Sequence, residues 1–337
     1  MTYFSSLLVL FVIQSILVLG LNFGYGTSGL LNFTYITFVA IGAYIGTIFS
    51  IGPPSANPEF QYVYLGTVPW PVNALLGGVA AAIGGAVLSA GILRGLRSDY
   101  LAIVTVAAGT IFYTIVGDTQ GLFNGFQGFF NIPNPAQSIL DPVGEQLAFA
   151  GLCAIFLVII LAALILIHRS PLGRALRAVR DDGALLEALG RNVFIYRFWA
   201  LVVSCFIAGL GGSLLASYST AFNPDAYLPP ETFILFAACI LGGRGNNWGA
   251  LLGAALVPVG ISEATRYLPA VISPTFVLEL RGALIGVALI LVMVWRPGGI
   301  LPERAASILR PWFRFRHWEV PAPTVAAPQG EAAITSN

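Results

Sequence analysis

Long apolar runs separated by short polar segments dominate this chain. A run of about 20 apolar residues can cross a bilayer as a helix. Seven runs come close to that length, and they cover residues 3–21, 29–51, 70–93, 100–116, 147–167, 198–218 and 278–295. The pattern predicts an all-α, polytopic membrane bundle with about seven full spans.

One further apolar run, 233–260, is interrupted by Gly, Asn and Arg residues at 242–249. As a single helix its 28 residues would extend only about 42 Å, whereas two full crossings need about 60 Å. The run therefore predicts a hairpin of two short, broken helices that enters and leaves the membrane on the same side.

Composition supports a membrane protein and excludes a soluble domain. Of the 337 residues, 57% are hydrophobic and 9% are charged, and the mean hydropathy is +0.84. A soluble domain would have about a quarter charged residues. The formal net charge of +1 gives no indication of nucleic-acid binding. We expect a membrane domain over 1–302 and a tail over 303–337 that is disordered towards its end.

Basic residues gather in 168–197, hereafter the basic segment. It contains His168 and six arginines, which are Arg169, Arg174, Arg177, Arg180, Arg191 and Arg197. Arginines also lie between the third and fourth predicted spans and after the last one. Because basic loops favour the cytoplasmic side, all three positions predict an external N-terminus and a cytoplasmic C-terminus. The external loops would be 52–69, 117–146, 219–232 and 261–277.

Ser170 and Pro171 predict a helix start within the basic segment. A serine hydroxyl can cap the first amides of a helix, and the missing N–H of proline is not needed at the first helical position. We therefore expect a short surface helix that meets a cytoplasmic partner.

No arrangement of side chains typical of an enzyme is evident. His168 and His317 lie in basic segments beside predicted spans, and Cys153, Cys205 and Cys239 lie inside apolar runs without metal-binding spacing. The chain has no lysine and therefore no phosphate-binding GxxxxGK[ST] loop. We expect no cofactor or metal in this chain, and we expect any ATP and Mg to be bound by other chains.

Two glycine clusters, 20–29 and 242–249, alternate with polar residues. Small residues let membrane helices approach closely. These two clusters go further and predict locally broken helices whose freed backbone groups line a polar cavity, as in transporters. Arg244 lies in the second cluster. It either holds the hairpin to its neighbours or lies near a transport path.

Several motifs share a pattern with one known family. The sequence reads LGLN at 19–22, RSDYLAIVT at 97–105, GGRGNNWGALLGA at 242–254 and RPG at 296–298, with the basic segment between the second and third. With these motifs the chain resembles the integral membrane permeases of branched-chain amino acid ABC transporters. The second motif is similar to that of the M-type (LivM-like) subunit.

The resemblance implies a multi-pass protein of the bacterial plasma (inner) membrane that works with partners. These would be a related H-type permease, two ABC ATPase subunits and an external solute-binding protein. The basic segment would dock the ATPase, with candidate coupling residues Ser170, Pro171, Gly173, Arg174, Arg177, Arg180, Asp181, Glu187 and Gly190. Candidate residues of the translocation pathway are Asn22, Asn32, Thr34, Tyr35, Tyr44, Thr105, Arg244 and Asn246.

The function implied by the resemblance is that of an ABC importer subunit, not an enzyme, which forms half of the pathway for branched-chain amino acids. Two alternatives stay open. The same architecture could carry urea or a short amide, and a different class of protein would be a channel or an ion-coupled carrier. A channel has no use for a docking helix, and the lack of carboxylates at the span centres argues against ion coupling.

Overall fold

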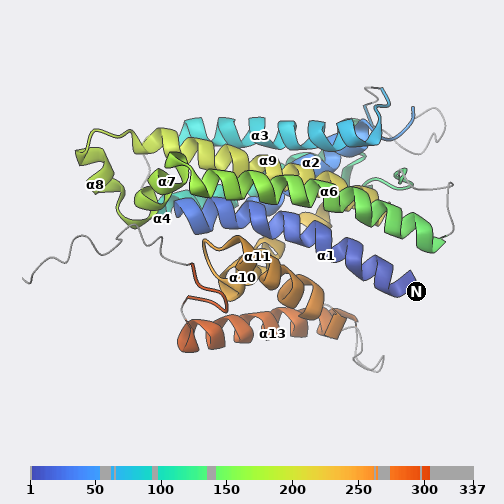
Figure 1. Cartoon of the computed structure of the whole chain (residues 1–337). Coiled ribbons are helices and arrows are strands. Elements are labelled where there is room, and N and C mark those ends of the chain that lie inside the picture. The colour runs from blue at the N-terminus through green and yellow to red at the C-terminus, as the bar shows by residue number, and fades with distance from the viewer. Residues whose placement is uncertain are drawn as a thin grey trace, which may run out of the picture. The chain divides into compact units, whose positions relative to one another are not determined.

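Four long apolar helices form the frame of the molecule. In this computed structural model they are α1 (Thr2–Leu21), α3 (Trp70–Ile92), α6 (Pro142–Arg169) and α9 (Val193–Ser219). Each is long and apolar enough to cross a membrane, and they run side by side in Figure 1. Two more long helices, α4 (Ser98–Asp118) and α13 (Pro274–Trp295), contain shorter apolar stretches among the described residues.

The structure describes residues 2–53, 62–63, 66–92, 98–134, 142–261, 263–264, 274–296 and 298–303. Over this part the only β-structure is two isolated bridges, Tyr62–Phe123 and Phe129–Phe222. The all-α prediction is therefore confirmed. Four described helices are both long and apolar enough to be spans, so that the number seven stays a prediction. Arg94 and Arg97, and the tail from 304 onwards, lie outside the described residues.

Helix α9 is the centre of the packing. It contacts α1, α2 (Tyr35–Ile48) and α3. A Cβ added to Gly42 of α2 would overlap the backbone of Gly209 in α9, and one added to Gly212 would overlap the carbonyl of Val39. The helix backbones thus touch, which small residues permit in a membrane bundle.

Helix α2 is shorter than the predicted span 29–51. The Asn32 side chain accepts a hydrogen bond from the Thr34 backbone N–H at 3.1 Å, and Gly29 has a φ of +75°. A side-chain turn of this kind competes with helical hydrogen bonding. The helix therefore begins only at Tyr35, and the expectation of a helix from residue 29 was wrong.

The two short helices predicted over 233–260 are present, and their placement in the membrane stays a prediction. They are α10 (Pro229–Gly242) and α11 (Asn247–Ala254), and α11 continues into the π-helix η5 (Ala255–Ile261). The turn between α10 and α11, residues 243–246, contains Gly243 and Gly245 at φ of +128° and +80°. Only glycine adopts such backbone angles readily, so the interruption in the apolar pattern is a true break between two helices.

The first glycine cluster is also a break. Helix α1 does not end at Leu21 but changes into the π-helix η1 (Asn22–Thr27). In a π-helix the hydrogen bonds join residues five positions apart instead of four. Such segments are rare and often mark functional sites. The prediction that both glycine clusters interrupt regular helices is therefore confirmed in the geometry of the backbone.

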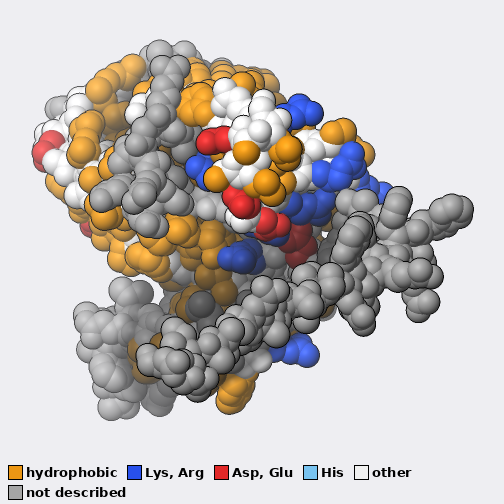
Figure 2. All heavy atoms as spheres, turned by 90° about the vertical axis from the view of Figure 1, so that its left-hand side faces the viewer, with side chains coloured by type: hydrophobic (Ala, Val, Ile, Leu, Met, Phe, Trp, Pro, Cys, Tyr) orange, Lys and Arg blue, Asp and Glu red, His pale blue; other side chains and the backbone are white. Residues whose placement is uncertain are grey.

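Two short helices, α7 (Pro171–Asp181) and α8 (Gly183–Ala188), close one end of the bundle, hereafter the α7 end. Figure 2 looks onto this end and shows arginine and acidic side chains lying among apolar ones. Helix α9 leads from here to the opposite end. Short helices follow the long ones there: α5 (Gln120–Phe123), η3 (Gly125–Gln127) and η4 (Pro224–Tyr227).

Candidate functional site

Helix α7 begins as the sequence predicts. The Gly173 backbone N–H donates to Ser170 Oγ at 3.4 Å, and Pro171 occupies the first helical position, which together cap the N-terminus. A Cβ on Gly173 would overlap the carbonyl of Ile167. Only glycine therefore lets α7 fold back closely onto the end of α6.

Helix α7 presents two different faces. Leu176 and Val179 are buried against the bundle, whereas Leu172 and Arg174 are exposed. On α8, Leu185 and the following Leu189 are exposed as well. The predicted coupling residues on this outer surface are Pro171, Arg174, Asp181, Glu187 and Gly190. The α7 end thus combines exposed leucines with charged side chains.

Two predicted coupling residues point into the molecule instead. The Arg180 guanidinium forms an ion pair with the Glu303 carboxylate at 2.8 Å, and Arg177 pairs with the same carboxylate at 3.4 Å. These three side chains are only 16% to 23% exposed. Sequence reasoning missed Glu303, because it was counted in the tail and no local pattern marks it as a partner of α7.

The structure brings the two glycine clusters together. Asn22 Oδ1 accepts a hydrogen bond from the Gly245 backbone N–H at 2.8 Å, and the Cys239 thiol donates to the same oxygen at 3.4 Å. Asn22 is fully buried. The two breaks therefore pack against each other, and Asn22 does not line an open cavity as the sequence analysis expected.

Arg244 and Asn246 hold the turn between α10 and α11 in place. The exposed guanidinium of Arg244 lies 5.9 Å from the centre of the Tyr25 ring in η1, a cation–π contact. Asn246 accepts from the Trp248 backbone N–H at 3.1 Å and donates to the Leu301 carbonyl at 3.1 Å. Of the two interpretations of Arg244, these contacts favour the structural one.

Three predicted pathway residues lie along the seam between α2 and α4. The Thr34 hydroxyl donates to the Thr105 carbonyl, and Gly109 of α4 packs against Thr34. Further along the seam, Tyr44 borders a small cavity together with Thr37, Gly109, Tyr113 and Tyr227. The Tyr44 hydroxyl is buried and has no hydrogen-bond partner among the described residues.

An aromatic cluster closes this seam at the end opposite α7. The Tyr44 ring centre lies 5.0 Å from that of Phe222, 5.4 Å from that of Phe123 and 5.7 Å from that of Phe129.

Tyr35, another predicted pathway residue, lies in the core between α2 and α1. Its hydroxyl donates to the Leu17 carbonyl at 2.8 Å and anchors α2 to α1. The predicted pathway residues therefore divide between the seam, the two breaks and the core.

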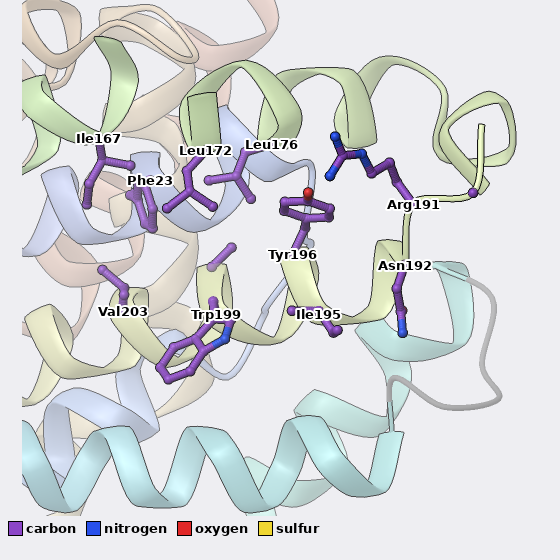
Figure 3. A pocket seen from close by; sticks show the side chains of 12 residues that line it. Phe23, Ile167, Leu172, Leu176, Arg191, Asn192, Ile195, Tyr196, Trp199 and Val203 are labelled. Carbon is purple, nitrogen blue, oxygen red and sulfur yellow. The ribbon is translucent and has the colours of Figure 1, made fainter. Parts of the chain in front are cut away.

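An apolar groove at the α7 end was not predicted. It has a volume of about 620 Å³ and lies between α7 and the first turns of α9. Leu172 and Leu176 of α7 reach toward α9, where Trp199 and Val203 lie, while Tyr196 and Arg191 stand at one end (Figure 3). The groove exists because α7 folds back beside α9, which hydrophobic periodicity alone does not reveal.

With this geometry established, comparison with known proteins identifies the family. A family model described as "Branched-chain amino acid transport system / permease component" matches residues 3–293. The chain belongs to this permease family. The high-affinity branched-chain amino acid permease LivM of Salmonella typhimurium is 31% identical over 314 residues, which cover 86% of this chain and 68% of that protein.

Two more distant permeases of Methanocaldococcus jannaschii also match. Its probable LivM is 26% identical over 329 residues, covering 89% of this chain and 93% of that protein. Its probable LivH is 26% identical over 274 residues, covering 79% of each. No solved structure matches the chain. The family match includes α7 and both helix breaks, whereas Glu303 lies beyond it.

Proposed function

We propose that this permease is the M-type subunit of an ABC importer for branched-chain or other hydrophobic amino acids. Membership of the family and 31% identity to a LivM protein support the proposal. The observation that carries it is the α7–α8 pair, which is capped, folded back on the bundle and exposed on its outer face. A permease that depends on a separate ATPase needs such a docking surface.

Two ATPase subunits, which would hold ATP and Mg, are the expected partners of the α7 end. Leu172, Leu185 and Leu189 are exposed beside charged residues such as Arg174. An apolar centre with a polar rim is typical of a protein interface. We therefore place α7 and α8 in contact with one ATPase of the complex.

We infer the orientation in the membrane from the position of the basic residues. Val87 of α3 and Leu166 of α6 are 70% and 69% exposed, as expected for helix surfaces in contact with lipid. The basic segment favours the cytoplasm for the α7 end. The aromatic cluster around Tyr44 would then lie on the external side, where a solute-binding protein delivers its cargo.

We place the translocation pathway along the α2–α4 seam. An H-type permease would complete it by covering the face of α4, where Ile103, Ile111 and Ile115 are exposed together with Thr110 and Thr114. The seam is closed by the aromatic cluster, so transport requires a second conformation. A ligand shifts that equilibrium only if it binds the two conformations with different affinity.

Purification of the tagged chain from its native membrane tests the assembly. Two ATPase subunits and a second permease should copurify with it. The double substitution Leu172→Glu with Arg174→Glu alters only exposed side chains of α7 and should abolish ATPase capture. Leu122→Glu on exposed α5 is the control and should leave capture intact. Full capture by the α7 variant would contradict docking at α7.

The cargo is tested with the complex reconstituted in liposomes. ATP-dependent uptake of labelled leucine that unlabelled isoleucine or valine inhibits would support branched-chain amino acids. Inhibition by urea or acetamide without inhibition by isoleucine would favour the amide alternative. Uptake by the isolated chain without ATPase subunits would indicate a channel or an ion-coupled carrier, and would overturn the proposal.

A further inference from the structure

The segment after α13 is joined to the hairpin by backbone hydrogen bonds. The Ile300 N–H donates to the Leu241 carbonyl at 2.9 Å, and the Leu301 N–H donates to the Gly242 carbonyl at 2.9 Å. These are carbonyls of the last turn of α10, which have no partner inside the helix. The segment is therefore fixed against the break in the hairpin, and it delivers Glu303 to α7.

Arg180 connects Glu303 to the other break. Its Nη1 donates to Glu303 Oε2 at 2.8 Å and to the Gly26 carbonyl at 2.5 Å. Gly26 lies in the last turn of η1, where carbonyl oxygens carry partial negative charge and attract a cation. One guanidinium of α7 thus binds the end of the first helix break and the carboxylate that follows α13.

The charge of Arg180 is permanent in this environment. Burial disfavours the charged guanidinium, but hydrogen bonds to Glu303 and Asp181 outweigh burial and raise the pKa of Arg180 above its ordinary value. Losing Glu303 would leave Arg177, a partly buried cation, without its ion-pair partner, whereas Arg180 would keep only its pair with the exposed Asp181 at 3.1 Å. A partly buried charge that loses its partner is costly, so substitution of Glu303 disturbs α7 as well as the segment after α13.

The backbone of Gly245 lies close to the ion pair between Arg180 and Glu303. A Cβ at this position would lie 2.7 Å from Glu303 Oε2 and 3.0 Å from Arg180 Nη1. The Gly245 N–H is also the donor to Asn22 in η1. The hairpin turn, η1, α7 and the segment after α13 therefore meet around Gly245, Arg180 and Glu303.

We propose that Arg180 and Glu303 form a charge clamp that passes movement of α7 to both helix breaks, η1 and the turn 243–246. The inference rests on the proposed function, because it assumes that a partner ATPase displaces α7. Arg180 and Glu303 act as positioning residues and touch no substrate. The connection is a contiguous set of hydrogen bonds and ion pairs, the kind of physical network through which packed elements are coupled.

A double-mutant cycle tests the clamp in the reconstituted complex with its ATPases and binding protein. The variants are Arg180→Gln, Glu303→Gln and the double variant, and the readout is solute taken up per ATP hydrolysed. Each single variant should lower this ratio about tenfold, within the usual range of site–site coupling. The double variant should be no worse than the single ones, because both substitutions break the same connection.

Arg169→Gln is the matched control. It removes an exposed arginine beside α7 that makes no hydrogen bond or ion pair with either break in the described part of the chain, so the ratio should not change. A merely structural role for the pair would reduce uptake and ATP hydrolysis in proportion and leave the ratio at the wild-type value. That result, or single effects that multiply in the double variant, would overturn the clamp.

Conservative variants keep the test valid if a glutamine variant does not accumulate. Arg180→Lys and Glu303→Asp retain both charges but change reach and geometry, and each should still lower uptake per ATP. Wild-type ratios in both would overturn the clamp. A wild-type complex without ATP-driven uptake would instead refute the proposed function, and the clamp with it.

Discussion

Asn22 Oδ1 accepts a hydrogen bond from the backbone N–H of Gly245 at 2.8 Å, and the two residues are 223 positions apart in the sequence. Each lies in a helix break, one in η1 and one in the turn between α10 and α11. Each break on its own exposes backbone groups that a membrane helix normally satisfies internally. In this permease a side chain of the first break accepts the hydrogen bond of a backbone donor in the second.

Replacing Asn22 with Ala should destabilise the permease. The Gly245 N–H would be buried without its acceptor, which costs about 1–3 kcal/mol. The thermal unfolding midpoint of the purified protein measures the effect. Asn192→Ala is the control, because Asn192 is exposed and its side chain makes no capping hydrogen bond. Equal midpoints for the two variants would show that the bond does not hold the breaks together.

Replacing Gly245 with Ala should lower the unfolding midpoint more than replacing Gly190 with Ala. Both glycines have similar backbone angles, with φ of +80° and +77°, so both variants share a backbone strain of about 1–2 kcal/mol. Only Gly245 adds an overlap with Glu303 and Arg180, since nothing lies within 4 Å of a Cβ at Gly190. Unfolding midpoints that fall equally would contradict the tight junction at Gly245.

A cysteine at Thr37 should report opening of the α2–α4 seam. Thr37 is nearly buried beside the small cavity at Tyr44, so a thiol reagent should label Thr37→Cys slowly at rest and faster during ATP-driven transport. Ser15→Cys, fully buried in α1, is the control and should stay unlabelled. The native cysteines are buried, which keeps the background low. Labelling that is independent of ATP would place the pathway elsewhere.

Labelling from one side of the membrane should settle the orientation. Phe126→Cys in η3 is 51% exposed in wild type and should react with an impermeant reagent in intact cells. Arg169→Cys at the α7 end should react only after the membrane is opened, because the basic segment favours the cytoplasm. If Arg169→Cys reacted in intact cells and Phe126→Cys only after the membrane is opened, the predicted orientation would be wrong.

Features that depend on neighbouring residues could be predicted well. The start of α7 follows from a serine and a proline, and the hairpin follows from an apolar run that is too short for two crossings and contains glycines. The late start of α2 was missed. There a single hydrogen bond from the Thr34 backbone N–H to the Asn32 side chain outweighs a continuous apolar pattern.

The sequence by itself determined a helical membrane protein with two interrupted helices and a basic surface helix, because hydrophobicity, glycine and capping act over a few neighbouring residues. Only the tertiary structure decided that the two breaks pair through Asn22 and Gly245, that Arg180 turns inward to Glu303, and that the groove lies between α7 and α9. Each of these features joins residues distant in the chain. Their hydrogen bonds and ion pairs depend on how the helices pack, which no local pattern encodes.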